Sequence, residues 1–568
     1  MDQIRRPHEG VRSAQGRGAI GETKYPGTAA SAAKRTEATR REELEAVKAP
    51  AERPAPSAFQ SILFQNPEKY PAAETAGEPD CFGDLNLDQT MASLTSGRDE
   101  YELLGYFHTS LTDVDDIAYR HEIMRDLEGP ALASRIRSFA ESMAAMRKHL
   151  VQAQKLHYRL QQESWFLTAV DTYCGCVAEL SEFLSQGGVK SRGMQAFAAF
   201  LVDYVASPRF QELRNKVRTL NDDLATVHYC VFLVGDGFRV HRYRDETDYS
   251  AEVEEAFAKF RQGNAKDYRS KLNDWIEMNH VEEKILEFVS QLWPEIFGRL
   301  AQFFQSEWGV FPDGKIVTFD RQVQFYLAYA EHMRRMEKVG LSFSYPVVSA
   351  KDKSVRAMDA FDIALAAKLA ADGGRVVSND FELSGKERIL VVSGPNQGGK
   401  TTFSRTFGQM HCLASLGLPV PGRETRLFLF GTIFTHFERE EDITNLRGKL
   451  QDDLVRVHEI LSRATPRSIV IMNEIFTSTT LQDATFLSEK VMDRIMKLDL
   501  ICVWVTFIHE LSRLGEKTVS MVSTVDPANP DKRTYKVVRK EASGRSYAMS
   551  IAEKYGLTEE RLKERIGK

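Results

Sequence analysis

A glycine-rich octapeptide with the spacing G-x-x-x-x-G-K-T is the part of this 568-residue chain whose chemistry is easiest to infer. Glycines in such a turn let the backbone curl around a phosphate with its N–H groups inward, and the positive N-terminus of the next helix faces the same anion. The lysine reaches the β- and γ-phosphates, and the hydroxyl residue holds Mg²⁺. We therefore expect a site for a nucleoside triphosphate and Mg²⁺ that includes Gly394, Pro395, Asn396, Gln397, Gly398, Gly399, Lys400, Thr401 and Thr402.

A second apolar run, 468–472, ends in Asn473 and Glu474. Nucleoside triphosphatases place the acids that organise Mg²⁺ and the attacking water at such a strand end, so Glu474 is the candidate base. The alternative interpretation is that Glu474 is an acid at the end of the strand that only contacts solvent. Asn473 stands where an Asp is usual, and a neutral amide makes a hydrogen bond about half as strong as a carboxylate does. We expect weaker Mg²⁺ binding or slower hydrolysis, with Thr401, Asn473 and Glu474 around the metal.

His509 follows a third apolar run, 500–505, again at the expected carboxyl end of a strand. An imidazole at that position can contact a γ-phosphate. A histidine without further context is more often a hydrogen-bonded structural residue. The position after the third strand favours the catalytic role, and we assign catalysis to Lys400, Glu474 and His509.

Composition limits the classes of protein to consider. The net charge of −5 gives no global electrostatic case for nucleic acid. No apolar run approaches the roughly 20 residues that cross a bilayer. The six cysteines lack metal-ligand spacing and suit a reducing compartment. We expect a cytoplasmic protein that does not enter a membrane.

Periodicity divides the chain into three parts. Residues 1–57 are poor in large apolar residues, which predicts a disordered tail. Residues 80–345 show mainly helical periodicity, with one predicted β-hairpin near 228–243 that carries Arg239, Arg242 and Arg244. That basic hairpin either contacts a nucleic-acid backbone or is a solvated strand face. From about 350 to 568, short apolar strands alternate with helices, which predicts an α/β P-loop domain with its site at the carboxyl ends of parallel strands.

Five motifs together resemble the MutS family of ABC-type ATPases. The family patterns are G-P-N-M-G-G-K-S, T-R-I-G-A-x-D-D, E-I-G-R-G-T-S-T-x-D, T-H-x-x-E-L and S-Y-G-I-x-V-A. The matching segments are 394–401, 435–442, 474–483, 509–511 and 546–552. The likeness runs through 376–556 and continues more weakly at Leu111, Thr112, Asp113, Ile117 and Arg120, which resemble the start of the family's core domain.

The resemblance implies a helical core and lever domain followed by an ATPase that works as a homodimer on DNA. It adds Asp483 to the nucleotide-binding residues. In the family, a Ser-Thr pair opens a helix that contacts the partner's γ-phosphate, and an ungapped reading places Gly448 and Lys449 there. The serine hydroxyl is missing, but backbone N–H groups and the charge of Lys449 can serve the same contact.

Differences between this sequence and the family's mismatch-reading members decide which functions we expect. Mismatch-reading members carry large N-terminal domains with a Phe-x-Glu wedge, whereas only the tail and about twenty-five residues precede the core-like segment here; Phe210 to Glu212 match the pattern inside a helical stretch. We therefore expect an ATP-driven helical clamp on structured or branched DNA rather than on mismatches. The alternatives are a nearly inactive nucleotide-gated module in a protein assembly and an RNA- or ribosome-associated ATPase.

Overall fold

The computed structural model describes residues 59–235, 237–246, 278–438, 448–526, 529–542 and 557–566. The predicted tail 1–57 lies outside these residues, as do the motif at 546–552 and the second half of the motif at 435–442.

Helices dominate the described residues before 340, as predicted. Short 3-10 turns at Pro67–Lys69 and Asp99–Tyr101 accompany them. The helices are α2 (Leu87–Thr95), α3 (Leu104–His108), α4 (Val114–Asp126), α5 (Pro130–Lys155), α6 (Arg159–Ser185), α7 (Arg192–Ala206), α8 (Pro208–Ala225), α10 (His280–Leu292), α11 (Pro294–Glu307) and α12 (Gly314–Glu337).

The predicted helical stripe of α5 forms part of the core. Proline at the first position suits the start of this helix, because its missing N–H would have no intrahelical partner there. Ile136, Phe139, Met143 and Met146 are all buried. The corresponding stripe of α10 is less covered, since Val289 is buried but Phe288 is exposed.

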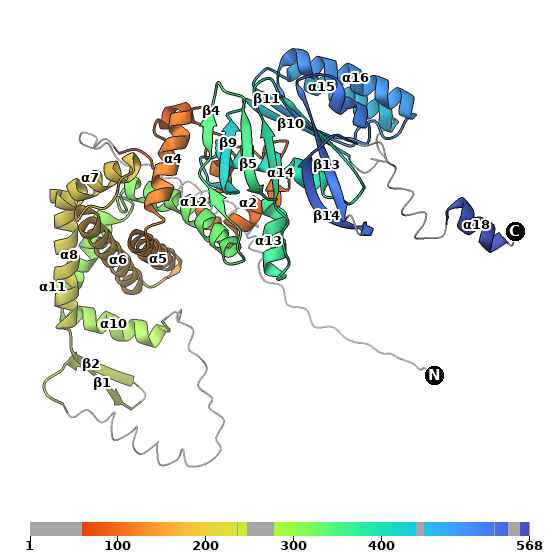
Figure 1. Ribbon diagram of the computed structural model, residues 1–568. Coiled ribbons are helices and arrows are strands. Elements are labelled where there is room, and N and C mark those ends of the chain that lie inside the picture. The colour runs from red at the N-terminus through yellow and green to blue at the C-terminus, as the bar shows by residue number, and fades with distance from the viewer. Residues whose placement is uncertain are drawn as a thin grey trace, which may run out of the picture. The chain divides into compact units, whose positions relative to one another are not determined.

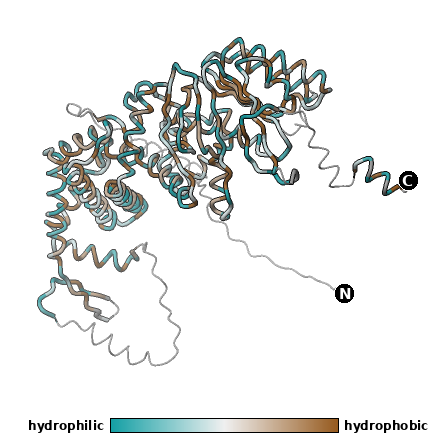
Figure 2. Tube along the Cα trace, viewed as in Figure 1, coloured by the Kyte–Doolittle hydropathy of each residue, from teal (hydrophilic) through white to brown (hydrophobic). Residues whose placement is uncertain are grey.

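The predicted hairpin is confirmed as β1 (Tyr229–Val234) and β2 (Gly237–Arg242), paired antiparallel. Its aromatic and aliphatic side chains remain largely in solvent, with exposed Tyr229, Val231 and Phe232. Along β2, apolar and polar residues alternate, whereas β1 is apolar from Cys230 to its end (Figure 2).

Strands and helices alternate after residue 340, which confirms the predicted α/β class. A six-stranded sheet has the order β10-β11-β12-β7-β13-β14 and is parallel except for β14. Its strands are β7 (Ile389–Ser393), β10 (Thr432–Phe437), β11 (Ser468–Asn473), β12 (Ile501–Val505), β13 (Thr518–Asp526) and β14 (Asn529–Arg539). The other elements of this part of the chain are the helices α13 (Ile363–Ala371), α14 (Lys400–Ser415), α15 (Lys449–Arg463), α16 (Leu481–Leu498) and α18 (Glu559–Ile566), and the 3-10 turn η4 (His509–Arg513).

Two smaller sheets complete this part. One has the order β4-β9-β5-β6, and the other pairs β3 with β8. Their strands are β3 (Phe343–Ser344), β4 (Val347–Ser349), β5 (Val355–Ala360), β6 (Asn379–Leu383), β8 (Val420–Pro421) and β9 (Glu424–Phe428).

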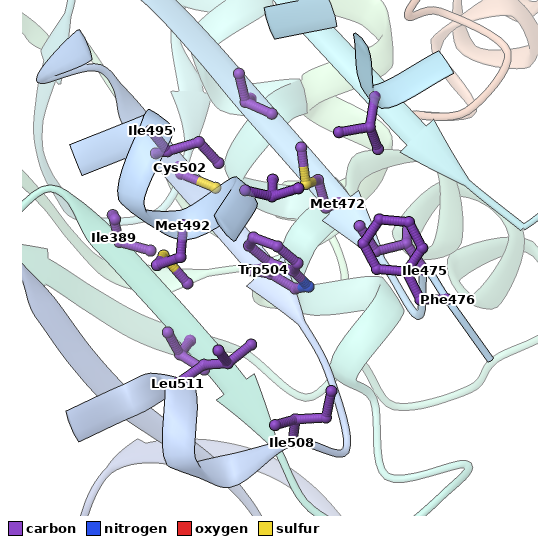
Figure 3. Close-up of a cluster of buried hydrophobic side chains, with 14 of the residues drawn as sticks. Ile389, Met472, Ile475, Phe476, Met492, Ile495, Cys502, Trp504, Ile508 and Leu511 are labelled. Carbon is purple, nitrogen blue, oxygen red and sulfur yellow. The ribbon is translucent and has the colours of Figure 1, made fainter. Parts of the chain in front are cut away.

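Both faces of the central strands β7, β11 and β12 are covered. Val470, Met472, Cys502 and Trp504 form one buried cluster with apolar residues of α15 and α16 (Figure 3). On the other face, Ile471 packs so closely on α14 that a Cβ added to Gly408 would lie 2.7 Å from its Cδ1. Strands covered on both sides read as continuous apolar runs, which is why these three were predictable.

The segment 59–86 packs on both the helical part and α14, and its residues 59–79 lie between the predicted tail and the predicted helical part. Ser61 donates a hydrogen bond to Gln322 of α12, while Arg405 and Gln409 of α14 donate to the carbonyls of Asp84 and Leu85. No helix among the described residues is long and apolar enough to span a bilayer.

Candidate functional site

The glycine-rich loop joins β7 to α14, as the motif predicted. Gly394 and Gly399 have φ of +126° and +89°, values that side chains rarely adopt. A Cβ on Gly398 would lie 2.3 Å from Ser523 Oγ, and one on Gly394 would lie 2.8 Å from the Ser523 carbonyl oxygen. The loop therefore needs glycine for its turn and for its close approach to β13.

Lys400 lies at the centre of this loop and is 5% exposed. Its Nζ donates hydrogen bonds of 3.2 Å to the carbonyls of Gly394 and Pro395 and to Asn396 Oδ1. It also lies 3.2 Å from Glu474 Oε1. A buried ammonium held by its own loop at a helix N-terminus has the chemistry that a nucleotide phosphate requires, so these residues fit ATP.

Thr401 and Asn473 meet at the same end of the sheet. The Thr401 hydroxyl donates a 3.0 Å hydrogen bond to Asn473 Oδ1, and Asn473 is buried. The described residues contain no group of three or more His, Cys, Asp or Glu that could hold a metal by themselves. The Thr401 hydroxyl and the Asn473 amide oxygen are hard oxygen donors of the kind that fit Mg²⁺ together with substrate phosphates.

Glu474 begins a strained turn after β11. Glu474 and Phe476 have φ of +53° and +60°, which is rare for large side chains. The Glu474 amide donates a 2.9 Å hydrogen bond to the Val505 carbonyl of β12. With the Lys400 contact, this geometry turns the Glu474 side chain toward the loop instead of away from it.

Asp483 and His509 do not join this cluster. Asp483 Oδ2 accepts hydrogen bonds from Thr479 and Thr480 at the start of α16, which is a helix-capping arrangement. His509 begins η4, and its Nδ1 lies 3.5 Å from Glu510 Oε2. Among the described residues, neither side chain makes a hydrogen bond or ion pair with the glycine-rich loop. An ungapped fit of T-H-x-x-E-L to 506–511 places the half-exposed Phe507 at the pattern's histidine.

Gly448 and Lys449 lie where α15 begins. Gly448 is the N-cap and offers no side-chain cap, and Lys449 Nζ forms an ion pair with Glu438 at the end of β10. Residues 439–447, which connect the two elements, lie outside the described residues.

Two contributors to the site escaped sequence reasoning. Ser523 Oγ donates a 2.6 Å hydrogen bond to the Gly398 carbonyl and so supports the loop from β13. Asp453 of α15 accepts a hydrogen bond from the Phe476 amide with its Oδ2 and lies 3.2 Å from His436 Nε2 with its Oδ1. Neither carries a local motif, because each acts on a segment distant in sequence.

Comparison with known proteins gives a consistent set of relatives. The family MutS domain V matches residues 390–565. A DNA mismatch repair protein MutS of Shouchella clausii is 30% identical over 189 residues, 32% of this chain and 22% of that protein. An Endonuclease MutS2 of Thermus thermophilus is 30% identical over 192 residues, 33% of this chain and 25% of that protein. The matched part thus spans about a quarter or less of the length of these relatives.

Proposed function

Residues 390–565 are a MutS domain V, an ATPase domain, and on that premise we propose that the chain binds and hydrolyses ATP with Mg²⁺ to switch a helical clamp on nucleic acid. The proposed partner is structured or branched DNA, and the proposed working unit is a homodimer in the cytoplasm. The expected domain limits, 80–345 for the helical part and 350–568 for the ATPase part, belong to the same proposal.

One observation supports this function most: Lys400 and Thr401, which begin α14, contact Glu474, which follows β11, and Asn473, which ends it. Parallel strands bind ligands at their carboxyl ends, and both pairs lie there. Bound Mg²⁺ neutralises the charge that develops on the phosphates. The role of Lys400 is to hold the phosphate oxygens, and that of Glu474 is to orient the attacking water and accept its proton.

Binding of ATP has a clear local consequence for Lys400. At present its Nζ is satisfied by two carbonyls, one amide oxygen and the Glu474 carboxylate. A phosphate competes for these donor positions, which releases Glu474 to face water. The proposed base thus becomes available when the substrate is bound.

Dimerisation would complete the site through α15. Its N-terminus, with Gly448 as cap, presents backbone N–H groups and the positive end of a helix of 15 residues. Although α15 has no serine hydroxyl at its start, such a helix end attracts a phosphate of the nucleotide that a second subunit binds. We assign the trans-contact to Gly448 and Lys449, with Asp483 and His509 as further nucleotide-site residues that the closed dimer brings in.

Mismatch reading receives no support from the Phe-x-Glu match. Phe210 is fully buried in α8 and packs against Tyr173 and Tyr204, so it is not free to enter a base stack. The hairpin β1–β2 instead offers exposed aromatic and basic side chains, among them Tyr229, Phe232 and Arg239. A surface of this kind contacts a nucleic-acid backbone and exposed bases without reading sequence.

A second candidate, a nucleotide-gated module with little hydrolysis, is favoured by the neutral Asn473 at the metal position and by Phe507 at the position of the pattern's histidine. In this function ATP acts as a conformational ligand, and differential binding to two states does the switching. The partner is then a protein, RNA or ribosome-associated assembly.

Steady-state ATP hydrolysis by the purified chain with Mg²⁺ separates the two candidates. The assay includes no nucleic acid, duplex DNA, branched DNA or structured RNA, each at two salt concentrations, because phosphate contacts weaken steeply with salt. Turnover stimulated most by branched DNA supports the clamp. Tight ATP binding without turnover supports the module. Lys400→Ala serves as the negative control, since it removes nucleotide binding in both cases.

A further inference from the structure

His436 of β10 is a buried polar side chain with an unusual environment. It is 1% exposed, and neither ring nitrogen makes a hydrogen bond with any residue that the structure describes. Its Nε2 nevertheless lies 3.2 Å from Asp453 Oδ1, an ion-pair distance across from α15. Buried polar groups are normally hydrogen-bonded. A buried histidine that faces a carboxylate without a hydrogen bond is therefore unfavourable in free energy, and the surrounding fold must stabilise it.

The second oxygen of Asp453 reaches the turn that carries Glu474. Asp453 Oδ2 accepts a 3.2 Å hydrogen bond from the buried Phe476 amide. Phe476 and Glu474 both have positive φ, a conformation that persists in large residues only where surrounding contacts enforce it. Asp453 supplies one such contact, and the Val505 carbonyl supplies another to the Glu474 amide.

Apolar packing fixes the turn from its other side. Figure 3 shows Ile475 and Phe476 next to Met472 in the buried cluster, and both side chains are almost completely covered. With its backbone held at two amides and its neighbours buried, the turn leaves the Glu474 side chain one direction, toward Lys400 Nζ at 3.2 Å.

Asp453 belongs to the second turn of α15, the helix whose N-terminus we assign to the contact between subunits. Arg456, one turn further, donates a 3.3 Å hydrogen bond to the Phe437 carbonyl at the end of β10. A displacement of α15 therefore acts on both β10 and the Glu474 turn.

We propose that Asp453, which faces the buried His436 across 3.2 Å, is a positioning residue that couples the location of α15 to the orientation of Glu474. The inference rests on the proposed function, because it gives Glu474 the role of base. It adds that the base is correctly oriented only while α15 holds its place, so that contact at the start of α15 is transmitted to the reaction.

The test compares Asp453→Ala with Glu459→Ala, which removes an exposed acid from the same helix. Hydrogen exchange measures the Phe476 amide, and ATP affinity and turnover are measured separately. We expect Asp453→Ala to speed exchange at Phe476 and to lower kcat by about tenfold to a hundredfold, as small misplacements of catalytic groups do, with ATP affinity changed by less than about twofold. Glu459→Ala should change none of these.

Asp453→Asn keeps an oxygen acceptor for the Phe476 amide but loses the charge facing His436. This variant should retain slow exchange at the Phe476 amide and should have a kcat between those of the wild type and Asp453→Ala. If the alanine variant does not fold, Asp453→Asn takes its place in the test. Unchanged Phe476 exchange in Asp453→Ala overturns the inference, and so does faster exchange with normal turnover. If the wild type hydrolyses no ATP, the proposed hydrolysis fails, and the coupling is then decided by Phe476 exchange alone.

Discussion

Thr401 donates a hydrogen bond of 3.0 Å from its hydroxyl to the amide oxygen of Asn473. The contact joins the first turn of the helix after the glycine-rich loop to the end of β11, the two places from which a P-loop site holds its metal. Because the acceptor is a neutral amide, the pair lacks the charge assistance that a carboxylate would give. Under the proposed function, we therefore predict that the hydrolysis rate depends on whether residue 473 carries an amide or a carboxylate.

Asn473→Asp should raise kcat. A carboxylate would accept the Thr401 hydrogen bond with charge assistance and would help to hold Mg²⁺, a gain of about 1 kcal/mol that corresponds to roughly fivefold in rate if it is realised in the transition state. Steady-state turnover at saturating ATP and a Mg²⁺ titration measure the effect. Asn215→Asp, at an exposed position of α8, is the matched control. An unchanged or lower kcat with normal Mg²⁺ affinity would show that the Asn473 amide does not limit the rate of hydrolysis.

Glu474→Gln should lower kcat by roughly 10²- to 10⁴-fold, because the amide cannot accept a proton from water. ATP should remain bound, and the proposed dimer should stay closed and become detectable as a larger species with ATP. Single-turnover hydrolysis and light scattering measure the two effects. Glu516→Gln, an exposed acid that pairs with Lys386, is the control. Hydrolysis at the wild-type rate in Glu474→Gln would exclude Glu474 as the base.

The parts of the fold that follow a local pattern were predictable from the sequence. The runs 389–392 and 468–472 became β7 and β11 because parallel strands buried on both faces need continuous apolar residues. The glycine-rich loop was predictable because phosphate binding requires particular residues at particular spacings. In the structure Thr401 contacts Asn473 and Lys400 contacts Glu474, while the roles of these residues in binding and catalysis stay predictions.

The supporting residues were not predictable, because their roles depend on contacts between distant segments. Ser523 supports the Gly398 carbonyl across 125 positions, through the pairing of β7 with β13. Asp453 carries no local motif, and only the fold brings it to the Phe476 amide. For His509, the position after a strand predicted a place at the site, whereas the structure records its Nδ1 at 3.5 Å from Glu510 Oε2 and, among the described residues, no hydrogen bond or ion pair with the glycine-rich loop.

Asp499 gives the ATPase part a defined pH dependence of stability. Burial alone would raise its pKa, but hydrogen bonds from Lys517 and Lys353 and the charges of Lys353 and Arg388 outweigh this and lower the pKa to about 2. Because the folded pKa lies below the unfolded value, the ionised group stabilises the fold above about pH 4, and this stability is lost as the pH falls toward 2. The side chain is 39% exposed, so we expect about 1 kcal/mol.

Asp499→Asn isolates this contribution, since asparagine also accepts the φ of +53° at this residue. The urea midpoint of the variant should be lower than that of the wild type at pH 7, and the difference should shrink as the pH approaches 2. A difference that stays constant between pH 7 and pH 2.5 would mean that the cations do not stabilise the ionised carboxylate.

Gly398→Ala should weaken ATP binding without unfolding the domain. The added Cβ would lie 2.3 Å from Ser523 Oγ and 2.9 Å from the Pro395 carbonyl oxygen, so the loop must move away from β13. Overpacking of this kind destabilises a structure by about 1–3 kcal/mol. If the whole destabilisation falls on the conformation of the loop that binds phosphate, the Kd for ATP rises roughly 5- to 150-fold. A fluorescent ATP analogue measures the affinity.

Comparison with Gly175→Ala and with a double variant separates crowding from a general effect of alanine. Gly175 lies inside α6 with open space around its Cα, so alanine there should leave the Kd unchanged. Adding Ser523→Ala to Gly398→Ala removes the nearest clashing atom but leaves the Pro395 carbonyl and also deletes the Ser523 hydrogen bond. We therefore expect the double variant to recover only part of the lost affinity. Full recovery would mean that Ser523 crowds the loop without supporting it, and no loss in Gly398→Ala would mean that the approach of β13 does not shape the phosphate site.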